Sequence, residues 1–351
     1  MASISGAQTN MGVKIATTWG TAVACGTANR FVAEVTPNFN VNELTSRTIG
    51  SGAYMLSSAT RGNFIPTVSV VGDMGYRNNC DVIIAQLWGT SGTPSEVTAS
   101  QGDYKHTITM NTTLNAKYLT LAYEDASATT MEFSTCACRS IGLKTTSVPG
   151  YLEFSAELLA NTATLSSSTN TNATLANCTF TEGTAELTAC DFSDLYRQNT
   201  SSGGSLSGSD QYNITGFDFS FNRPQDIVPE IKGASGNAAP VSSGYWDGTF
   251  NVTVKELADH AMYTLWSAET AYKAYVDVQG TQIASGTNKT VRLYLPKMLL
   301  VTEPQYNLTS AGTNTLSLSW RLLKASSNPT GMSSTYPYWE ITNTLSTSLL
   351  A

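Results

Sequence analysis

The stretch YLEFSAELLA, residues 151–160, has apolar side chains at alternate positions and ends with two leucines. TLSLSWRLLKA, residues 315–325, repeats this pattern in the second half of the chain. The alignment pairs Leu152 with Leu316, Phe154 with Leu318, Ala156 with Trp320, Leu158 with Leu322 and Leu159 with Leu323. Alternation over this length is typical of a β-strand that buries one face. The chain therefore contains nearly the same strand twice, about half its length apart.

Three further pairs of segments match in the same order. GNFIPTVSVV (62–71) corresponds to GYWDGTFNVT (244–253), and each is followed by a segment with helical spacing. The first helix is expected to begin after Asn78 or Asn79 and to end at Gly89, since asparagine favours the first position and glycine the last. The second is expected within VKELADHAMYTLWSA (254–268), with Leu257, Ala261 and Leu265 on one stripe. The other matches are NFNVNE (38–43) with DFSFNR (218–223), and KYLTLAYED (117–125) with KAYVDVQG (273–280).

Four matches in one order indicate an internal duplication. We therefore expect a mainly β (α+β) chain of two tandem β-sandwich or barrel domains, each flanked by one α-helix. The polar, low-complexity run 161–177 is typical of a linker or surface loop. The expected organisation is an N-terminal arm (1–24), a first domain (25–160), this linker (161–177), a second domain (178–326) and a C-terminal arm (327–351).

Composition excludes several classes of protein. Of 351 residues, 41% are hydrophobic and 13% charged, which suits a folded β-protein with a neutral polar surface. A net charge of −7 argues against a protein that grips nucleic acid, because such binding needs a basic face. The N-terminus has no apolar run that predicts a signal peptide, and the longest strongly apolar run, 298–301, is far too short to span a membrane. The six scattered cysteines are expected to stay reduced, as in a protein made in a cytoplasm.

No constellation of catalytic residues stands out. The chain has two histidines, His106 and His260, and neither lies in a pattern typical of zinc ligands. Nucleophile-elbow, phosphate-loop and dinucleotide-binding motifs do not occur. Acidic pairs such as Glu124–Asp125 and Glu153/Glu157 have the residue type of a glycosidase site, but the sequence shows no aromatic-lined cleft to accompany them. We therefore expect no catalytic residue, no metal and no cofactor.

Strand alternation predicts which side chains share a face. If Phe39 and Val41 point inward, their asparagine neighbours point outward; if Val68 and Val70 point inward, Ser69 points outward. The outward positions are small and polar, with occasional glutamates, and carry no aromatic side chains. They are Asn38, Asn40, Asn42, Thr67, Ser69, Glu153, Ser155, Glu157, Ser220, Asn222, Thr249, Asn251, Ser317, Ser319 and Arg321.

Three segments carry a resemblance to a known family. TTWGTAVACGT (17–27), VTPNFNVNELTSRTIGSG (35–52) and YRNNCDVIIAQLWGTSGT (76–93) resemble an opening motif, a first strand with its long loop, and a flanking helix. With the duplicated unit, they make the chain similar to the major tail tube proteins of long-tailed bacteriophages, in a duplicated two-domain form. The resemblance covers roughly residues 15–330.

The resemblance implies a structural virion protein with tail-tube-type domains. Six such domains form a ring, inner strands line a channel, and rings stack into a tube through which the genome passes. Because this chain carries two domains, three copies would fill six positions with pseudo-sixfold symmetry; a hexamer with one domain decorating the outside is the alternative assembly. Expected partners are further copies of the chain, the tape measure protein, the tail terminator and tail-tip proteins. DNA is expected to cross the channel without specific binding, and no membrane is involved.

Two sets of residues receive predicted roles. A neutral to acidic channel wall is assigned to Asn40, Asn42, Ser69, Glu153, Glu157, Ser220, Asn222, Asn251 and Ser319. By resemblance, the loops Thr45–Arg61 and Asp226–Ser243 are expected to stack one ring on the next, through Thr45, Arg47, Tyr54, Arg61, Asp226, Glu230, Lys232 and Ser243.

Two other classes are compatible with the composition. One is a tandem β-sandwich binding module or adhesin, for which Tyr336, Tyr338 and Trp339 would be an exposed aromatic cluster. The other is a further virion shell component, such as a decoration or capsid protein. Electron microscopy of the purified protein would distinguish the three classes: rings for a tail tube protein, monomers for an adhesin and flat shells for a shell component.

Overall fold

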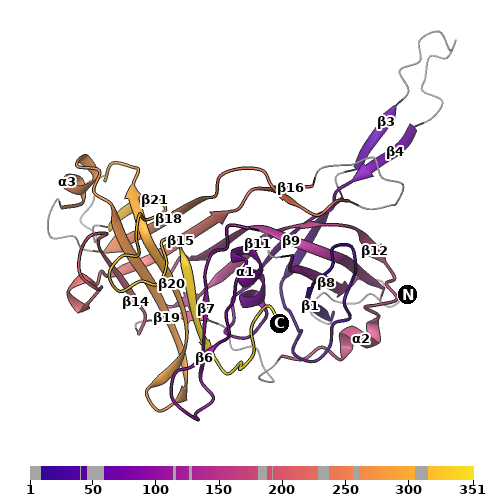
Figure 1. Ribbon diagram of the computed structural model, residues 1–351, viewed down its shortest axis with the longest axis horizontal. Coiled ribbons are helices and arrows are strands. Elements are labelled where there is room, and N and C mark those ends of the chain that lie inside the picture. Colours follow the sequence, from indigo (N-terminus) through magenta and orange to yellow (C-terminus); the bar gives the residue numbers. More distant parts are fainter. Residues whose placement is uncertain are drawn as a thin grey trace, which may run out of the picture.

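Antiparallel strands make up about half of the computed structural model (Figure 1). It describes residues 9–39, 41–45, 59–113, 116–125, 129–180, 188–191, 193–227, 237–255, 261–304 and 315–351. The main strands of the first half are β1 (Met11–Ala16), β2 (Glu34–Asn38), β5 (Thr67–Asp73), β8 (Tyr118–Glu124), β9 (Thr130–Thr145) and β11 (Glu153–Ala160). Those of the second half are β14 (Leu195–Thr200), β15 (Ile214–Asn222), β18 (Asp247–Lys255), β19 (Tyr272–Ala284), β20 (Thr287–Leu300) and β21 (Thr315–Leu322).

Shorter elements complete the chain. The large sheet also contains β6 (Ser95–Glu96), β7 (Tyr104–Ile108), β12 (Ala163–Leu165) and β22 (Tyr338–Asn343). Three two-stranded sheets pair β3 (Val41–Thr45) with β4 (Ala59–Phe64), β10 (Gly150–Tyr151) with β13 (Ala189–Cys190), and β16 (Gln225–Asp226) with β17 (Val241–Ser242). The helices are α1 (Cys80–Trp88), α2 (Asn172–Ala176), α3 (Ala261–Ser267) and the short 3₁₀ turn η2 (Gly208–Asp210).

The two halves have the same strand order. Hydrogen-bonded neighbours run β2-β5-β11-β9-β8-β1 in the first half and β15-β18-β21-β20-β19-β14 in the second. β9 also pairs with β15, so the halves share one continuous sheet. The predicted mainly β fold is confirmed. A common origin of the halves stays a prediction, since strand order alone does not establish a duplication.

The repeated strands alternate as expected. In β21 the leucines and Trp320 are buried, whereas Thr315, Ser317 and Arg321 are exposed. β11 buries Phe154, Ala156 and Leu158 in the same way. The alternation does not extend past β2, because Phe39 is 37% exposed, and the expectation that it points into the core is wrong.

The two helices differ in burial. α1 begins after Asn79 and ends at Gly89, whose positive φ of 85° and N–H bond to the Ala85 carbonyl close the helix as predicted. All of α1 except Val82 is buried. In α3 only Met262 is buried, and the predicted stripe residue Leu257 lies outside the described residues.

The C-terminal segment is part of the sheet. β22 pairs on one side with β20 of the second half and on the other with β7 of the first half. Trp339 is fully buried and lies edge-on to Trp88 and Phe219, and Tyr338 is 1% exposed. The idea that Tyr338 and Trp339 form an exposed aromatic cluster is therefore wrong.

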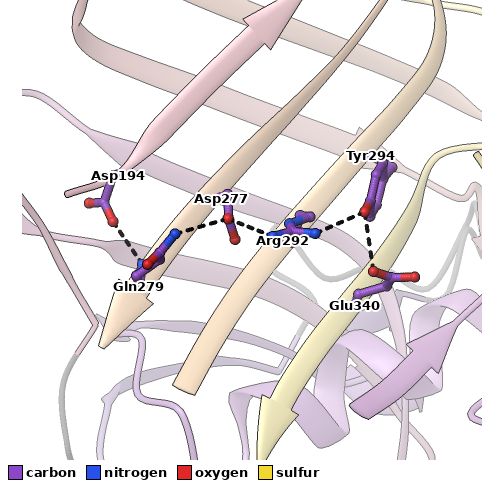
Figure 2. A network of polar contacts seen from close by, with 6 residues as sticks. All are labelled: Asp194, Asp277, Gln279, Arg292, Tyr294 and Glu340. Carbon is purple, nitrogen blue, oxygen red and sulfur yellow. Dashed lines mark hydrogen bonds and ion pairs between the residues drawn. The ribbon is translucent and has the colours of Figure 1, made fainter. Parts of the chain in front are cut away.

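A row of polar side chains joins β22 to the strands of the second half (Figure 2). Arg292 Nη2 donates to Asp277 Oδ2 at 2.6 Å, and Asp277 is only 1% exposed. Arg292 also donates to the Tyr294 hydroxyl, which in turn donates to Glu340 of β22 at 3.2 Å. Removing either Asp277 or Arg292 would destabilise the arrangement, because the partner would remain as an unpaired, partly or fully buried charge.

Two expectations concern the thiols and membrane insertion. All six cysteines are buried and unpaired, as predicted for reduced thiols. Within the described residues, none of the helices has the length and apolarity that crossing a bilayer requires.

Candidate functional site: the polar face and the open edges of the sheet

One face of eight neighbouring strands is polar. The strands are β2, β5, β11, β9, β15, β18, β21 and β20, in that spatial order. Their inward side chains form the apolar core, and alternate residues point to the other side. The register places outward residues in rows across the strands: Thr36–Ser69–Glu157–Ser140–Asn222 is one row, and Lys144–Asp218–Asn251–Ser319 is part of another. The surface called the polar face below comprises these rows and the outward residues between them.

Seven of the nine residues predicted to line a channel lie on this polar face. They are Ser69, Glu153, Glu157, Ser220, Asn222, Asn251 and Ser319. Asn40 lies outside the described residues. Asn42 lies on β3, which pairs with β4 in a separate two-stranded sheet rather than in the large one. The geometry thus groups seven of these residues; their role stays a prediction.

Cross-strand ion pairs neutralise the two predicted glutamates. Lys144 Nζ lies 2.8 Å from Glu153 Oε1, and Arg139 Nη2 lies 2.8 Å from Glu157 Oε1. The Glu153 carboxylate raises the pKa of Lys144 by accepting its hydrogen bond. A third pair joins Arg321 to Asp247 at 3.2 Å. The sequence reasoning missed Arg139 and Lys144 because it assigned no strand to residues 130–145; the alternation of CACRSIGLK (136–144) was the available signal.

The described part of the polar face carries a small excess of acidic groups. Its carboxylates are Glu34, Asp73, Glu153, Glu157, Asp218 and Asp247, and its basic groups are Arg139, Lys144, Lys255, Lys297 and Arg321. The remaining outward residues are mostly serine, threonine and asparagine. Two shallow hollows of about 480 and about 260 Å³ lie on it, the larger around Lys144, Asp218 and Ser317 and the smaller around Ser69, Glu157 and Ser220. Such a surface offers hydrogen bonds but no dense basic patch for phosphate groups.

The junction between the halves is closely packed. β15 pairs with β9 from Phe217–Thr145 to Asn222–Ser140. Beneath this pairing, Trp88 of α1 contacts the rings of Phe219 and Phe221 at 6.4 and 4.8 Å between centroids. Beside it, Arg223 Nη1 donates to the Leu87 carbonyl at 2.7 Å, and Gln225 Nε2 donates to the Cys138 carbonyl at 2.9 Å. β15 of the second half is thus held against β9 of the first half.

The corresponding strands at the two outer ends have one open side each. β2 pairs with β5 only, although its counterpart β15 pairs with both β18 and β9. At the other end, Met298 of β20 pairs with Tyr272 of β19 as well as with β21, and only Leu299 and Leu300 pair with β21 alone. The matching part of β9 pairs with both β11 and β15. Within the described residues, these edges correspond to the two sides of the internal junction.

The predicted stacking loops are described only in part. Thr45 lies on β3 and Arg61 on β4, Asp226 lies on β16, and the Ser243 N–H donates to the Pro224 carbonyl. Arg47, Tyr54, Glu230 and Lys232 lie outside the described residues. The stacking role of these loops stays a prediction.

The remaining candidates for reactive chemistry are metal-binding clusters and the two histidines. Among the described residues, no three His, Cys, Asp or Glu side chains form a group that could hold a metal ion. His106 is buried, its Nε2 lies 3.1 Å from Asn343 Oδ1 and 3.0 Å from the Leu345 carbonyl, and burial lowers its pKa. His260 lies outside the described residues. The arrangement of His106 is that of a structural side chain that ties β7 to the C-terminal segment.

Comparison with known proteins agrees with a structural role. No curated protein matches the chain. The family described as "Phage tail tube protein" matches residues 6–322, most of the 351 residues and both halves. Members of this family are structural components of the virion tail, where they build the tube together with other tail proteins. The chain therefore belongs to the phage tail tube protein family.

Proposed function

We propose that three copies of this chain close into a ring, that rings stack into the tail tube, and that the polar face lines its channel. The observation that carries this proposal is the internal junction: both halves contribute four strands to one continuous sheet with one common polar face. Three copies would supply about 24 strands to a closed barrel, in which no sheet edge remains.

The open edges give the direction of assembly. β2 of one copy would pair with the end of β20 of the next, as β15 pairs with β9 inside the chain. This contact is head-to-tail, since the two surfaces differ, and such a contact produces a ring when its rotation closes. In the proposed ring, successive copies meet through the same rotation that relates the two halves within one chain.

The helices support the same arrangement. α1 packs on β9 and is buried, and Trp88 at its end contacts Phe219 and Phe221 of β15 in the second half. α3 packs on β20, the counterpart of β9, but is largely exposed, with Tyr263 44% exposed. A neighbouring copy at the β20 edge would cover α3 as the second half covers α1.

The alternative hexamer is less well supported. In that assembly one domain would decorate the outside and only the other would line the channel. The shared sheet argues against it, since separating the halves would break the β9–β15 ladder and expose Trp88, Phe219 and Phe221. An adhesin is disfavoured by the burial of Tyr338 and Trp339, and it would not need two matching open edges.

The chemistry of the polar face suits passage of DNA. Duplex DNA carries about one negative charge per 1.7 Å, so a basic wall would hold it through many phosphate contacts. Paired charges and uncharged polar groups avoid this attraction. They also offer few unpaired charges that could hold a tape measure protein in the channel. The terminator and tail-tip proteins would close the two ends of the stack.

Edge variants in native mass spectrometry test the ring. Proline in place of Thr302, next to the end of β20, removes a backbone donor from the proposed contact edge, whereas Thr302→Val keeps it. We expect rings of three copies for the unmodified chain and Thr302→Val, and folded monomers for Thr302→Pro. Six-copy rings, or monomers of the unmodified chain at millimolar concentration, would contradict the proposal.

A further inference from the structure

Two of the buried cysteines, Cys25 and Cys178, lie side by side although they belong to different parts of the chain. A Cβ added at Gly12 of β1 would lie 3.0 Å from the Cys25 sulfur and 3.1 Å from the Cys178 sulfur, so both sulfurs flank the same point. The Cys25 thiol donates a hydrogen bond to Cys178. Each cysteine is 4% exposed. Glycine at position 12 leaves the room that the two side chains share.

Hydrogen bonds that do not involve the thiols hold the two segments together. The Cys25 N–H donates to Asn170 Oδ1 at 2.8 Å, and Asn170 Nδ2 donates back to the Val23 carbonyl at 3.2 Å. Further along, the Arg30 N–H donates to the Thr179 carbonyl at 3.1 Å. The segment after β1 therefore lies against the linker between the halves, and these contacts bring the two sulfurs together.

The surroundings of Cys178 differ from those of the other thiols. The hydrogen bond from Cys25 and the nearby cations Arg30 and Lys14 lower the pKa of Cys178. Burial raises the pKa of the four cysteines outside this pair, which are Cys80, Cys136, Cys138 and Cys190. The thiolate is the form that attacks a disulfide, so Cys178 is the thiol best placed to begin an exchange reaction.

A short helix separates Cys178 from solvent. Both of its chain neighbours, Asn177 and Thr179, are exposed. α2, which ends just before them, has five residues and buries only Leu175, against Ala122 of β8. A helix of this length has little stability of its own, so it opens locally at low cost. Such an opening gives a small molecule access to Cys178 while the pairing of β1 with β8 stays intact.

We propose that Cys25 and Cys178 form a disulfide once the virion has left the reducing cytoplasm, with a low-molecular-weight disulfide as the oxidant. Thiols stay reduced inside the cell, so the chain folds and assembles with both cysteines free. The bond then joins the segment after β1 to the linker and closes residues 25–178 into one loop. This inference goes beyond the proposed ring and does not depend on it.

The exchange has two steps that conserve atoms and electrons. The Cys178 thiolate attacks one sulfur of the small disulfide, which forms a mixed disulfide and releases one thiolate. Cys25 gives its proton to that thiolate and attacks the Cys178 sulfur, and the second thiolate leaves and takes up the proton that Cys178 had lost. The two protein thiols are oxidised, and the small disulfide is reduced to two thiols. The hydrogen bond to Cys178, which raises the pKa of Cys25, is lost in the mixed disulfide, so Cys25 ionises more readily there.

Oxidised glutathione added to the purified full-length chain tests the proposal. We expect the thiols that titrate after denaturation to fall from six to four, and peptide mapping without reduction to find Cys25 joined to Cys178. The melting temperature should rise by roughly 5–10 °C, because the bond closes a long loop, and dithiothreitol should reverse the change. The matched control is Cys190→Ala, which removes a buried thiol outside the pair and should still lose two thiols.

Serine variants separate the two steps. Cys25→Ser keeps the attacking thiol and lacks the one that displaces glutathione, so each chain should retain one glutathione on Cys178. Cys178→Ser should remain unmodified, and the oxidant should leave its melting temperature unchanged.

Three results would overturn the proposal: six titratable thiols after prolonged oxidation, a disulfide between other cysteines, or a Cys25→Ser chain without glutathione. Should a serine variant fail to fold, the peptide map of the unmodified chain decides by itself. Ring formation is not a readout in these experiments, so a failed oxidation leaves the proposed ring standing.

Discussion

Replacing Glu153 and Glu157 by lysine would make the polar face basic without disturbing the core. Both side chains are about one-third or more exposed and pair with Lys144 and Arg139 across the strands. Each exposed ion pair contributes about 0.2–1 kcal/mol, so losing two pairs and placing like charges opposite each other should cost about 1–3 kcal/mol of folding free energy. The chain should therefore still fold and assemble.

The change in channel charge is large compared with the charge of the DNA inside one ring. Each substitution adds two charge units, so the double variant adds about twelve positive units around a ring of three copies. The two central strands of the second half's polar face, β15 and β18, have nine residues each, which corresponds to a height of about 30 Å. Duplex DNA carries about 18 phosphate charges over that length, so the added charge could neutralise most of them. Every ring would then retard the DNA that passes.

The assay is the rate of DNA ejection from phage that carry the variant, measured by dye binding or single-particle fluorescence after receptor triggering. We expect slower ejection for Glu157→Lys and slower still for the double variant, with relief at high salt because phosphate contacts weaken with ionic strength. The matched control is Glu96→Lys, an exposed residue on β6 that is not on the polar face. If phage with the double variant had tails of normal length and ejected DNA at the unmodified rate, the assignment of this face to the channel would be refuted.

Three further predictions concern the stability of the chain. Asp277→Ala should lower the free energy of unfolding by about 2–3 kcal/mol, because Arg292 loses its buried partner. Lys105→Ala should lower it by less than about 1 kcal/mol, since the contact of Lys105 with Glu340 is 3.7 Å long and partly exposed. Equal effects of the two substitutions in urea denaturation would contradict the role of the polar row in Figure 2. Gly280→Ala should lower the free energy of unfolding by about 1–3 kcal/mol, since the added Cβ would lie 2.5 Å from the buried Tyr76 ring. Gly204→Ala, with open space around the added Cβ, should change it by no more than about 0.5 kcal/mol. A Gly280→Ala variant of unchanged stability would show that Tyr76 can move. Burial raises the pKa of Asp194 from 3.8 to about 6, so the folded chain binds this proton more tightly than the unfolded chain. As pH falls from 7 to 5, the unmodified chain should therefore gain about 1 kcal/mol of stability relative to Asp194→Asn. Thermal melts in which the two chains change in parallel with pH would contradict this.

The fold could be predicted where apolar residues recur with a single clear spacing along the sequence. The alternation in 151–160 and 315–325 predicted β11 and β21, and Asn79 and Gly89 predicted the ends of α1. The alignment between halves was less accurate. If Val70 matches Val252, the ladders place Ala156 opposite the first and Leu318 opposite the second, not Ala156 with Trp320. An error of two residues leaves every side chain on the same face, and for this reason seven predicted channel residues still lie together.

Other features depended on contacts distant in sequence. Nothing local in STYPYWEI (334–341) shows that β22 inserts between β20 and β7. An aromatic-rich segment after the second unit was easily taken for a surface cluster. The pairing of Glu153 with Lys144 likewise needed the register of β11 on β9. The burial of α1 and the exposure of α3 could not be read from two similar helical patterns, since the difference lies in what covers them.

Cryo-electron microscopy of the assembled protein tests the central claim most directly. We expect a ring of three chains around a central channel, with β2 of each copy hydrogen-bonded to the end of β20 of the next and Ser69, Asn222 and Ser319 facing the channel. A particle without a channel, or a ring in which the second half lies outside and its polar face points away from the axis, would contradict the account.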